Sequence, residues 1–245
     1  MENFRIVVEY DGTAYHGWQR QKADRTIQGE IEKALMAMTG KPVSLAGSGR
    51  TDAGVHAFGQ TASFRSDAGL SPDIFFKGLN SLLPGDIYIK TCQLANPGFH
   101  ARYDVLSKIY QYRILNREKP SVMKRHYVWH IRRLLNVEAM QEAASCFLGE
   151  KDFSAFEGTG SPRTSTVRHV MRSEITLEND DTILFHIEAN GFLRYMVRNI
   201  VGTLVDVGRG KVTTLDVKKI LLSKNRNLAS ATAPARGLFL MQVNY

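Results

Sequence analysis

The sequence predicts an α+β protein made of two halves. Its 245 residues are 43% hydrophobic and 23% charged, which is typical of a globular chain that buries a substantial core. Strand-like alternation and helix-like spacing of apolar residues follow one another from the start, and this order of elements begins again after residue 105. We therefore expect one α+β half at residues 1–105 and a second at residues 106–245.

The first half is expected to open on a strand at residues 4–10, where apolar side chains recur at every second position. Thr26 is a good N-cap for the following helix, whose apolar stripe runs up to Gly40. The other elements expected in this half are strands at residues 43–46 and 60–64, a helix from Pro72 to about Leu83 after Ser71, and a strand at residues 86–92.

The second half is expected to begin with a strand at residues 108–115, and Asn136 is predicted to cap a helix at residues 137–148. The later elements expected are strands at residues 167–177 and 182–189, helices at residues 191–207 and 214–222, and a closing strand at residues 237–243. Residues 158–165 are small and polar and are predicted to form a mobile loop.

The charge of the chain favours a polyanionic partner. The formal net charge is +8 and the isoelectric point is about 9.5, so the protein should attract polyanions through a long-range field that weakens with salt. Nucleic acid is the leading partner, although charge of this size also occurs in proteins that bind none. The basic residues are dispersed along the sequence, so the fold must gather them if they form a groove.

Several classes of protein are disfavoured by the sequence. No apolar run is long enough to cross a bilayer and the amino terminus does not resemble a signal peptide, so we expect a cytoplasmic protein with no membrane partner. Cys92 and Cys146 fit neither zinc-site spacing nor a disulfide framework and are predicted to be buried thiols. His126 and His130 stand four apart but lack the intervening glutamate of a zinc helix, so no metal site is expected.

The densest pattern in the chain is the loop at residues 49–57, which reads GRTDAGVHA. Its glycines allow a sharp turn around Asp52, and Arg50 can bind a phosphate or stabilise the ionised carboxylate. An ionised carboxylate can act as a nucleophile or a base, so Asp52 is a candidate catalytic residue and Arg50 and His56 are candidate substrate-binding residues. The alternative is a structural turn in which Asp52 only bonds nearby backbone amides.

Three further groups could act with Asp52. Arg194 and Arg198 share a face of the predicted helix at residues 191–207, where either could reach a carboxylate or could simply be solvated. Tyr110 and Tyr112 share a face of their strand and could stack on bases or pack in the core. The aromatic segment at residues 15–21 could face a nucleotide, or its Trp18 could anchor a loop on the core.

With these segments in view, the chain closely resembles the tRNA pseudouridine synthase A family over essentially its whole length. The resemblance rests on the loop at residues 49–57 and on six further motifs from one terminus to the other. These are residues 15–21 (YHGWQRQ), 99–102 (FHAR), 108–113 (KIYQYR), 152–156 (DFSAF), 191–193 with 196–202 (GFL and MVRNIVG), and 233–234 with 237–240 (AP and GLFL).

The resemblance implies isomerisation of uridine to pseudouridine at positions 38–40, in the anticodon stem-loop of tRNA. It assigns Asp52 as the catalytic aspartate, Tyr110 as the tyrosine that stacks on the base and assists loss of the C5 proton, and Arg198 as the arginine paired with the aspartate. Arg50 matches the residue that fills the space left by the flipped nucleotide, and Leu240 an apolar contact of the pocket. The sequence does not decide which first step the carboxylate takes. Attack at C1′, attack at C6 and proton abstraction at C2′ all use the same group.

The resemblance also implies the pseudouridine synthase fold, with two α/β-sandwich halves whose mostly antiparallel sheets meet at a central basic cleft, and a homodimer. The isomerisation needs no redox change and no energy input, so no cofactor and no metal are expected. A non-catalytic protein that binds an RNA stem-loop is the main alternative. An aspartate-dependent hydrolase of a small substrate would leave the +8 charge unexplained.

Overall fold

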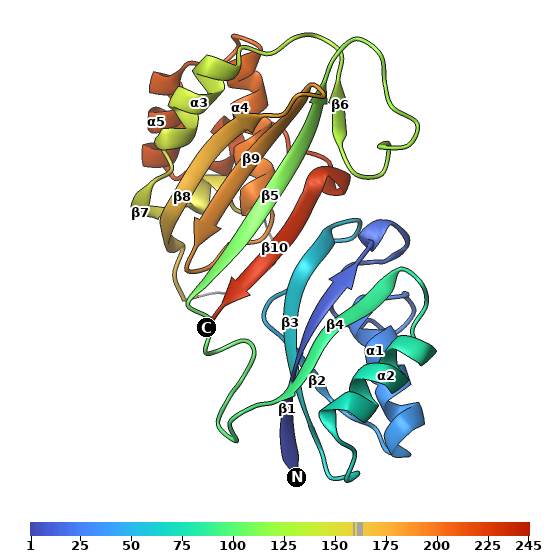
Figure 1. Ribbon diagram of the computed structural model, residues 1–245. Helices are drawn as coiled ribbons and strands as arrows, with labels where there is room; N and C mark the ends of the chain where they lie inside the picture. The colour runs from blue at the N-terminus through green and yellow to red at the C-terminus, as the bar shows by residue number, and fades with distance from the viewer. Residues whose placement is uncertain (159, 161–163) are drawn as a thin grey trace. The chain divides into compact units, whose positions relative to one another are not determined.

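The computed structural model describes residues 1–158, 160 and 164–245, and these divide into two compact units. Unit 1 comprises Met1–Leu106 together with Phe239–Tyr245, and unit 2 comprises Ser107–Leu238. Each unit carries a sheet with its own helices (Figure 1). The α+β class predicted from the sequence is therefore confirmed.

The sheet of unit 1 has the strand order β4-β1-β3-β10, and the short β2 pairs with β3. All of its pairings are antiparallel except that of β10 with β3. Its elements are β1 (Glu2–Tyr10), α1 (Ile27–Thr39), β2 (Leu45–Gly47), β3 (His56–Ser66), α2 (Pro72–Leu82), β4 (Ile87–Leu94) and β10 (Leu238–Asn244).

The helices α1 and α2 cover one face of this sheet, because each helix and β1 has an apolar side to bury. Phe4 of β1 and Phe64 of β3 stack at 5.1 Å, and Phe75 of α2 meets both rings edge-on. Thr26 caps α1 as the sequence predicts, accepting the N–H of Gly29. Ser71 caps α2 by accepting the N–H of Ile74.

The sheet of unit 2 has the order β5-β9-β8-β7, with β6 pairing in parallel with β5 and the other strands antiparallel. Three helices, α3, α4 and α5, cover one of its faces (Figure 1). The elements are β5 (Ser107–Asn116), β6 (Trp129–Ile131), α3 (Val137–Ser145), β7 (Gly149–Asp152), β8 (Val167–Leu177), β9 (Thr182–Ala189), α4 (Met196–Gly208) and α5 (Thr214–Ser223).

The core of unit 2 lies between the sheet and α4, whose apolar residues are almost all buried. Phe185 and Ile187 of β9 face this core with 1% and 0% exposure, as strand alternation requires. Asn136 caps α3 as the sequence predicts, accepting the N–H of Ala139 at 2.9 Å. These contacts fix α4 and the strand β5, which carry Arg198 and Tyr110.

The boundaries of several elements differ from those predicted. The helix expected from residue 191 begins at Met196, because Tyr195 has a φ of 60° that no helical residue adopts. The strand β3 begins at His56 instead of residue 60, directly after the glycine loop. The short strands β6 and β7 are not predicted, since neither shows an alternating pattern of useful length.

The remaining structural expectations concern membranes, metals and thiols. No helix among the described residues is long and apolar enough to span a bilayer. Within the same residues, no cluster of histidine, cysteine and acidic side chains could hold a metal ion. Cys146 is buried and Cys92 is half-buried, and burial raises the pKa of the Cys92 thiol to about 12. Residues 159 and 161–163 of the loop predicted to be mobile lie outside the described residues.

Candidate active site

Asp52 lies in unit 1, in the loop that joins β2 to β3. Because β2 and β3 pair antiparallel, the two ends of this loop are held next to each other. The loop closes tightly, with the N–H of Val55 donating to the carbonyl of Asp52 at 3.1 Å. The preceding Thr51 is buried whereas Asp52 is half-buried. The carboxylate is therefore carried on an ordered turn and retains access to solvent.

The residues that follow β1 pack directly against this loop. The N–H of Trp18 donates to the carbonyl of Thr51 at 3.1 Å, and the N–H of Gly54 donates to the carbonyl of Tyr15 at 3.3 Å. Gly17 has a φ of 91°, and a Cβ on it would lie 2.5 Å from the Thr51 carbonyl oxygen. Only glycine allows so close an approach of the two backbones.

Trp18 anchors this assembly to the core of unit 1, which decides between the two roles that the sequence left open for it. Its side chain is 3% exposed and fills the space where Gly47 lacks a Cβ. Nearby, the hydroxyl of Tyr10 lies 2.8 Å from that of Thr51. Burial raises the pKa of Tyr10, which keeps the phenol neutral at physiological pH.

A second group of hydrogen bonds holds the start of the loop. The hydroxyl of Ser48 donates to Oε1 of Gln60 at 2.5 Å, and Nε2 of Gln60 donates to the carbonyl of Gly49 at 2.9 Å. The N–H of Ser48 also donates to the carbonyl of Thr61 at 2.8 Å. Ser48 and Gln60 are both buried, so this network fixes the backbone immediately before Arg50.

The three other candidate residues of unit 1 differ in exposure. Arg50 is exposed at the start of the loop. His56, the first residue of β3, is 2% exposed, and its ring stacks on Phe239 at 4.7 Å while Nδ1 accepts the N–H of Gly12 at 3.1 Å. Leu240 lies on β10 and is 1% exposed. His56 thus ties the end of the loop to the segment after β1 and to β10.

Tyr110 lies on β5 in unit 2, together with Tyr112 two residues on. Tyr110 is 8% exposed and meets Phe192 edge-on at 5.0 Å. Tyr112 is fully buried and donates its hydroxyl proton to the carbonyl of Pro234 at 2.7 Å. Burial raises the pKa of Tyr112, so this phenol stays a hydrogen-bond donor. Tyr112 therefore packs in the core, whereas Tyr110 lies at the margin of the core.

Arg198 lies in the first turn of α4 and is half-buried. Its Nε donates to the carbonyl of Ala233 at 2.8 Å, and its guanidinium lies 4.9 Å from the ring centre of Tyr195. The positive charge of Arg198 also acts on the buried Tyr112, where it opposes the effect of burial on the pKa. Arg198 is thus held in place, whereas Arg194 is exposed, with its guanidinium 4.8 Å from the ring centre of Tyr195.

Two further residues, which the sequence does not mark as candidates one by one, support Arg198. Asn199 is fully buried, donates to the carbonyl of Phe156 at 2.7 Å and accepts the hydroxyl proton of Thr232 at 2.6 Å. Gly202 lets the backbone of residue 231 approach, since a Cβ there would lie 1.9 Å from that carbonyl oxygen. An amide inside an apolar helical stripe is the signal that could have revealed this role for Asn199.

The candidate residues are divided between the units. Unit 1 holds Arg50, Asp52, His56 and Leu240, and unit 2 holds Tyr110 and Arg198. A cavity of about 370 Å³ in unit 2 is lined by Gln111, Arg113, Lys124, Tyr127, Val128, Glu178, Thr182 and Leu184. Because Gln111 alternates with Tyr110 along β5, this cavity opens on the other face of the strand, and we do not assign it to the substrate.

Comparisons with known proteins identify the family. The family model described as tRNA pseudouridine synthase matches residues 6–104 and 143–245. The chain is 47% identical to the tRNA pseudouridine synthase A of Acetivibrio thermocellus and 48% identical to that of Thermoanaerobacter sp. (strain X514), in each case over 100% of both chains. It is 41% identical to the corresponding protein of Clostridium acetobutylicum, again over both whole chains. The chain therefore belongs to the tRNA pseudouridine synthase family and is an isomerase that converts uridine to pseudouridine in tRNA.

Proposed function

We propose that Asp52 is the catalytic carboxylate of this isomerase and that its target is a uridine at positions 38–40 in the anticodon stem-loop of tRNA. The observation that carries this proposal is the construction of the Asp52 loop. The backbone of the loop is hydrogen-bonded to β3 and to the segment after β1, while the side chain of Asp52 is half-buried. Such a loop holds a reacting group in a fixed position, which is a main source of enzymatic rate enhancement.

The reaction exchanges one glycosidic bond for another. The N1–C1′ bond breaks, the uracil turns, and a C5–C1′ bond forms; C5 then loses its proton and N1 carries one in the product. The base must first leave its stack, at a cost of roughly a few kcal/mol. We propose that the exposed Arg50 takes the place of the flipped nucleotide and that Leu240 provides an apolar wall for the uracil.

Tyr110 and Arg198 are proposed to act on the same uridine as Asp52. Tyr110 lies at the margin of the core, where its ring can stack on a base and its hydroxyl can assist loss of the C5 proton. Arg198 is held by the Ala233 carbonyl and the Tyr195 ring, and we propose it as the arginine that the family resemblance pairs with the aspartate.

The oligomeric state of the enzyme and its cellular compartment are also proposals. We infer that it works as a homodimer in the cytoplasm, as the sequence resemblance implies, and that it uses no cofactor. The substrate of the family, tRNA, supports the cytoplasmic assignment.

The test uses unmodified tRNA transcripts labelled with tritium at uridine C5. The wild-type protein is expected to release tritium and to leave pseudouridine at one or more of positions 38–40, as mapped along the transcript. Asp52→Asn is expected to retain tRNA binding and to lower the rate of tritium release by at least about a hundredfold, because the amide cannot act as nucleophile or base.

Asp67→Asn is the matched control. Asp67 is an exposed aspartate of unit 1 that pairs with Lys41 at 3.3 Å, so the variant removes the same charge away from the loop. It is expected to react as the wild type does. Undiminished tritium release by Asp52→Asn would remove Asp52 from the mechanism, and pseudouridine found only outside positions 38–40 would refute the proposed target.

A further inference from the structure

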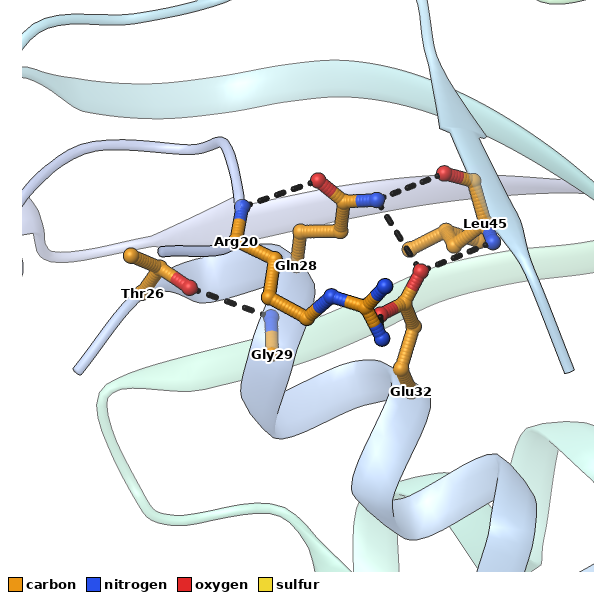
Figure 2. A network of polar contacts seen from close by, with 6 residues as sticks. All are labelled: Arg20, Thr26, Gln28, Gly29, Glu32 and Leu45. Atoms are coloured by element: carbon orange, nitrogen blue, oxygen red, sulfur yellow. Dashed lines mark hydrogen bonds and ion pairs between the residues drawn. The ribbon is translucent and has the colours of Figure 1, made fainter. Parts of the chain in front are cut away.

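The first turns of α1 carry a buried carboxylate, Glu32. Its side chain is only 9% exposed. Oε1 accepts two hydrogen bonds, from the N–H of Leu45 in β2 at 3.1 Å and from Nε2 of Gln28 at 2.9 Å (Figure 2). Oε2 is buried as well and accepts no hydrogen bond within the described residues. A carboxylate taken out of water in this way needs a nearby positive charge.

Arg20 supplies that charge. Its Nη1 lies 3.1 Å from Oε2 of Glu32, an ion pair without the alignment of a hydrogen bond. The backbone N–H of Arg20 donates to Oε1 of Gln28 at 3.0 Å, so Gln28 links the two residues (Figure 2). The aliphatic part of Arg20 runs past Gly29, whose missing Cβ would lie 4.0 Å from it. Both ends of the Arg20 side chain are therefore held.

Most of the Arg20 side chain nevertheless faces solvent. It is 70% exposed, and among the described residues Glu32 is the one acidic group within ion-pair distance of its guanidinium. A guanidinium has five N–H donors in a planar fork. With one edge against Glu32, the other donors remain available to a ligand with several acceptor oxygens, and a phosphate has this chemistry.

Arg20 also lies close to the Asp52 loop. The N–H of Trp18, two residues earlier, donates to the Thr51 carbonyl at 3.1 Å. Two residues span at most about 7 Å, which places the Arg20 backbone within about 12 Å of that carbonyl. Along one strand of a duplex, phosphates recur about every 3.4 Å of helix axis. An RNA strand whose uridine reaches Asp52 therefore brings neighbouring phosphates close to Arg20.

We propose that Arg20 binds a phosphate of the tRNA backbone near the target uridine, and that Glu32 is the positioning residue that holds its guanidinium for this contact. The inference rests on tRNA being the substrate and on Asp52 marking the place where the uridine enters. The two oxygens of Glu32 have separate roles. Oε1 links β2 to α1 through its two hydrogen bonds, and Oε2 holds the guanidinium of Arg20 by the ion pair.

The first experiment measures Kd for tRNA as a function of salt, together with kcat and KM for pseudouridine formation. Arg20→Ala is expected to raise Kd and KM about three- to tenfold with kcat unchanged, and to lower the slope of log Kd against log salt by about 0.7 to 0.9, the value of one phosphate contact. Arg20→Lys, which keeps the charge, is expected to recover most of the slope.

Lys41→Ala is the matched control for the loss of one positive charge. Lys41 is exposed, pairs with an exposed aspartate at 3.3 Å, and follows the far end of α1. Thr39, the last residue of α1, lies seven residues beyond Glu32, about 10 Å along the helix axis, so Lys41 lies beyond the far end of the helix from the Arg20 guanidinium. The variant is expected to leave KM and the salt slope at their wild-type values.

Glu32→Gln tests the positioning role. The glutamine keeps an acceptor for the Leu45 N–H but removes the ion pair, so the Arg20 side chain gains freedom. We expect KM to rise about two- to fivefold with the salt slope unchanged, because the charge of Arg20 is still present. Combined with Arg20→Ala, Glu32→Gln is expected to add no further rise.

Each contrary outcome overturns a stated part of the inference. An Arg20→Ala variant with wild-type KM and salt slope, or one that loses thermal stability and kcat with the slope unchanged, would make Arg20 purely structural. Tighter tRNA binding by Glu32→Gln would show that Glu32 only reduces the local positive charge. Undiminished activity of Asp52→Asn would refute the proposed function instead, so the two failures are distinguishable.

Discussion

At the scale of single residues, Gly17 shows how closely the Asp52 loop is fitted to its support. Gly17 has a φ of 91° and lies against the Thr51 carbonyl, so a side chain there meets both backbone strain and a steric clash. Gly40, at the end of α1, has a φ of 70° but no atom within 4 Å of the position of a Cβ. Alanine substitutions at the two glycines therefore separate the effect of backbone strain from that of a steric clash.

We predict that Gly17→Ala lowers the free energy of unfolding by about 2–4 kcal/mol, whereas Gly40→Ala lowers it by about 1–2 kcal/mol, the cost of left-handed backbone alone. Because the clash displaces residue 51, Gly17→Ala should also lose pseudouridine-forming activity beyond its unfolded fraction. Urea unfolding and kcat of the two variants provide the measurements. Equal effects of both substitutions on stability and activity would show that the loop tolerates displacement.

The residues that could react are easier to predict from the sequence than the contacts that hold those residues in place. The glycines, Arg50 and Asp52 are visible as one pattern, because a sharp turn and a carboxylate need particular residue types. The support from Gly17 and the burial of Asn199 depend on backbone segments that meet only in the folded chain. The amide of Asn199 stands out inside an apolar stripe, but no local rule identifies the backbone segments that it and Gly17 meet.

At the scale of elements, Asp152 connects the end of β7 to the end of α5. Its carboxylate accepts the N–H of Ser154 at 3.0 Å and lies 3.1 Å from Nζ of Lys224, the residue after α5. Burial alone would raise the pKa of Asp152, but hydrogen bonds from Thr166 and Ser154 and the contact with Lys224 outweigh it and leave the pKa well below its ordinary value.

We predict that Asp152→Asn lowers the free energy of unfolding by about 1 kcal/mol at pH 7, a modest value because the Lys224 side chain is 64% exposed. A lowered pKa stabilises the folded state above the ordinary value of 3.8, and that stability is lost as the pH falls further. The difference between variant and wild type should therefore shrink below about pH 4. Urea unfolding at several pH values would show this, and a pH-independent difference would contradict it.

Elements with long, regular patterns are predicted well. The strands β8 and β9 have the predicted limits, since each has apolar residues on one side and a turn between them. The start of α4 is not predicted, because the apolar spacing continues back through residues 191–195 while Tyr195 adopts a left-handed conformation. A periodic pattern reports burial and cannot report such a local exception.

At the scale of the whole molecule, the net charge of +8 should govern how the protein meets tRNA. We predict that the Kd for tRNA rises at least tenfold between 50 and 200 mM salt, roughly the effect of two phosphate contacts, while kcat at saturating tRNA changes little. Filter binding across this range of salt, with parallel single-turnover kinetics, is the measurement. A flat salt profile would mean that the basic residues do not act together on the RNA.

The sequence does not predict which distant segments pair in the fold. The closing strand is predicted as an element, but nothing in its residues indicates that β10 pairs in parallel with β3. The choice of partner is set by the shape of the completed sheet, not by a local pattern.

This return of the final strand has a consequence for biosynthesis. Phe239–Tyr245 completes unit 1, where the N–H of Leu106 bonds the carbonyl of Asn244 and the hydroxyl of Tyr245 bonds that of Ala101. A ribosome adds about 5–20 residues each second, so the first unit waits on the order of ten seconds for its last strand. During that interval the start of β3, at His56 and Ala57, lacks its β10 partner and is open to pairing with another chain.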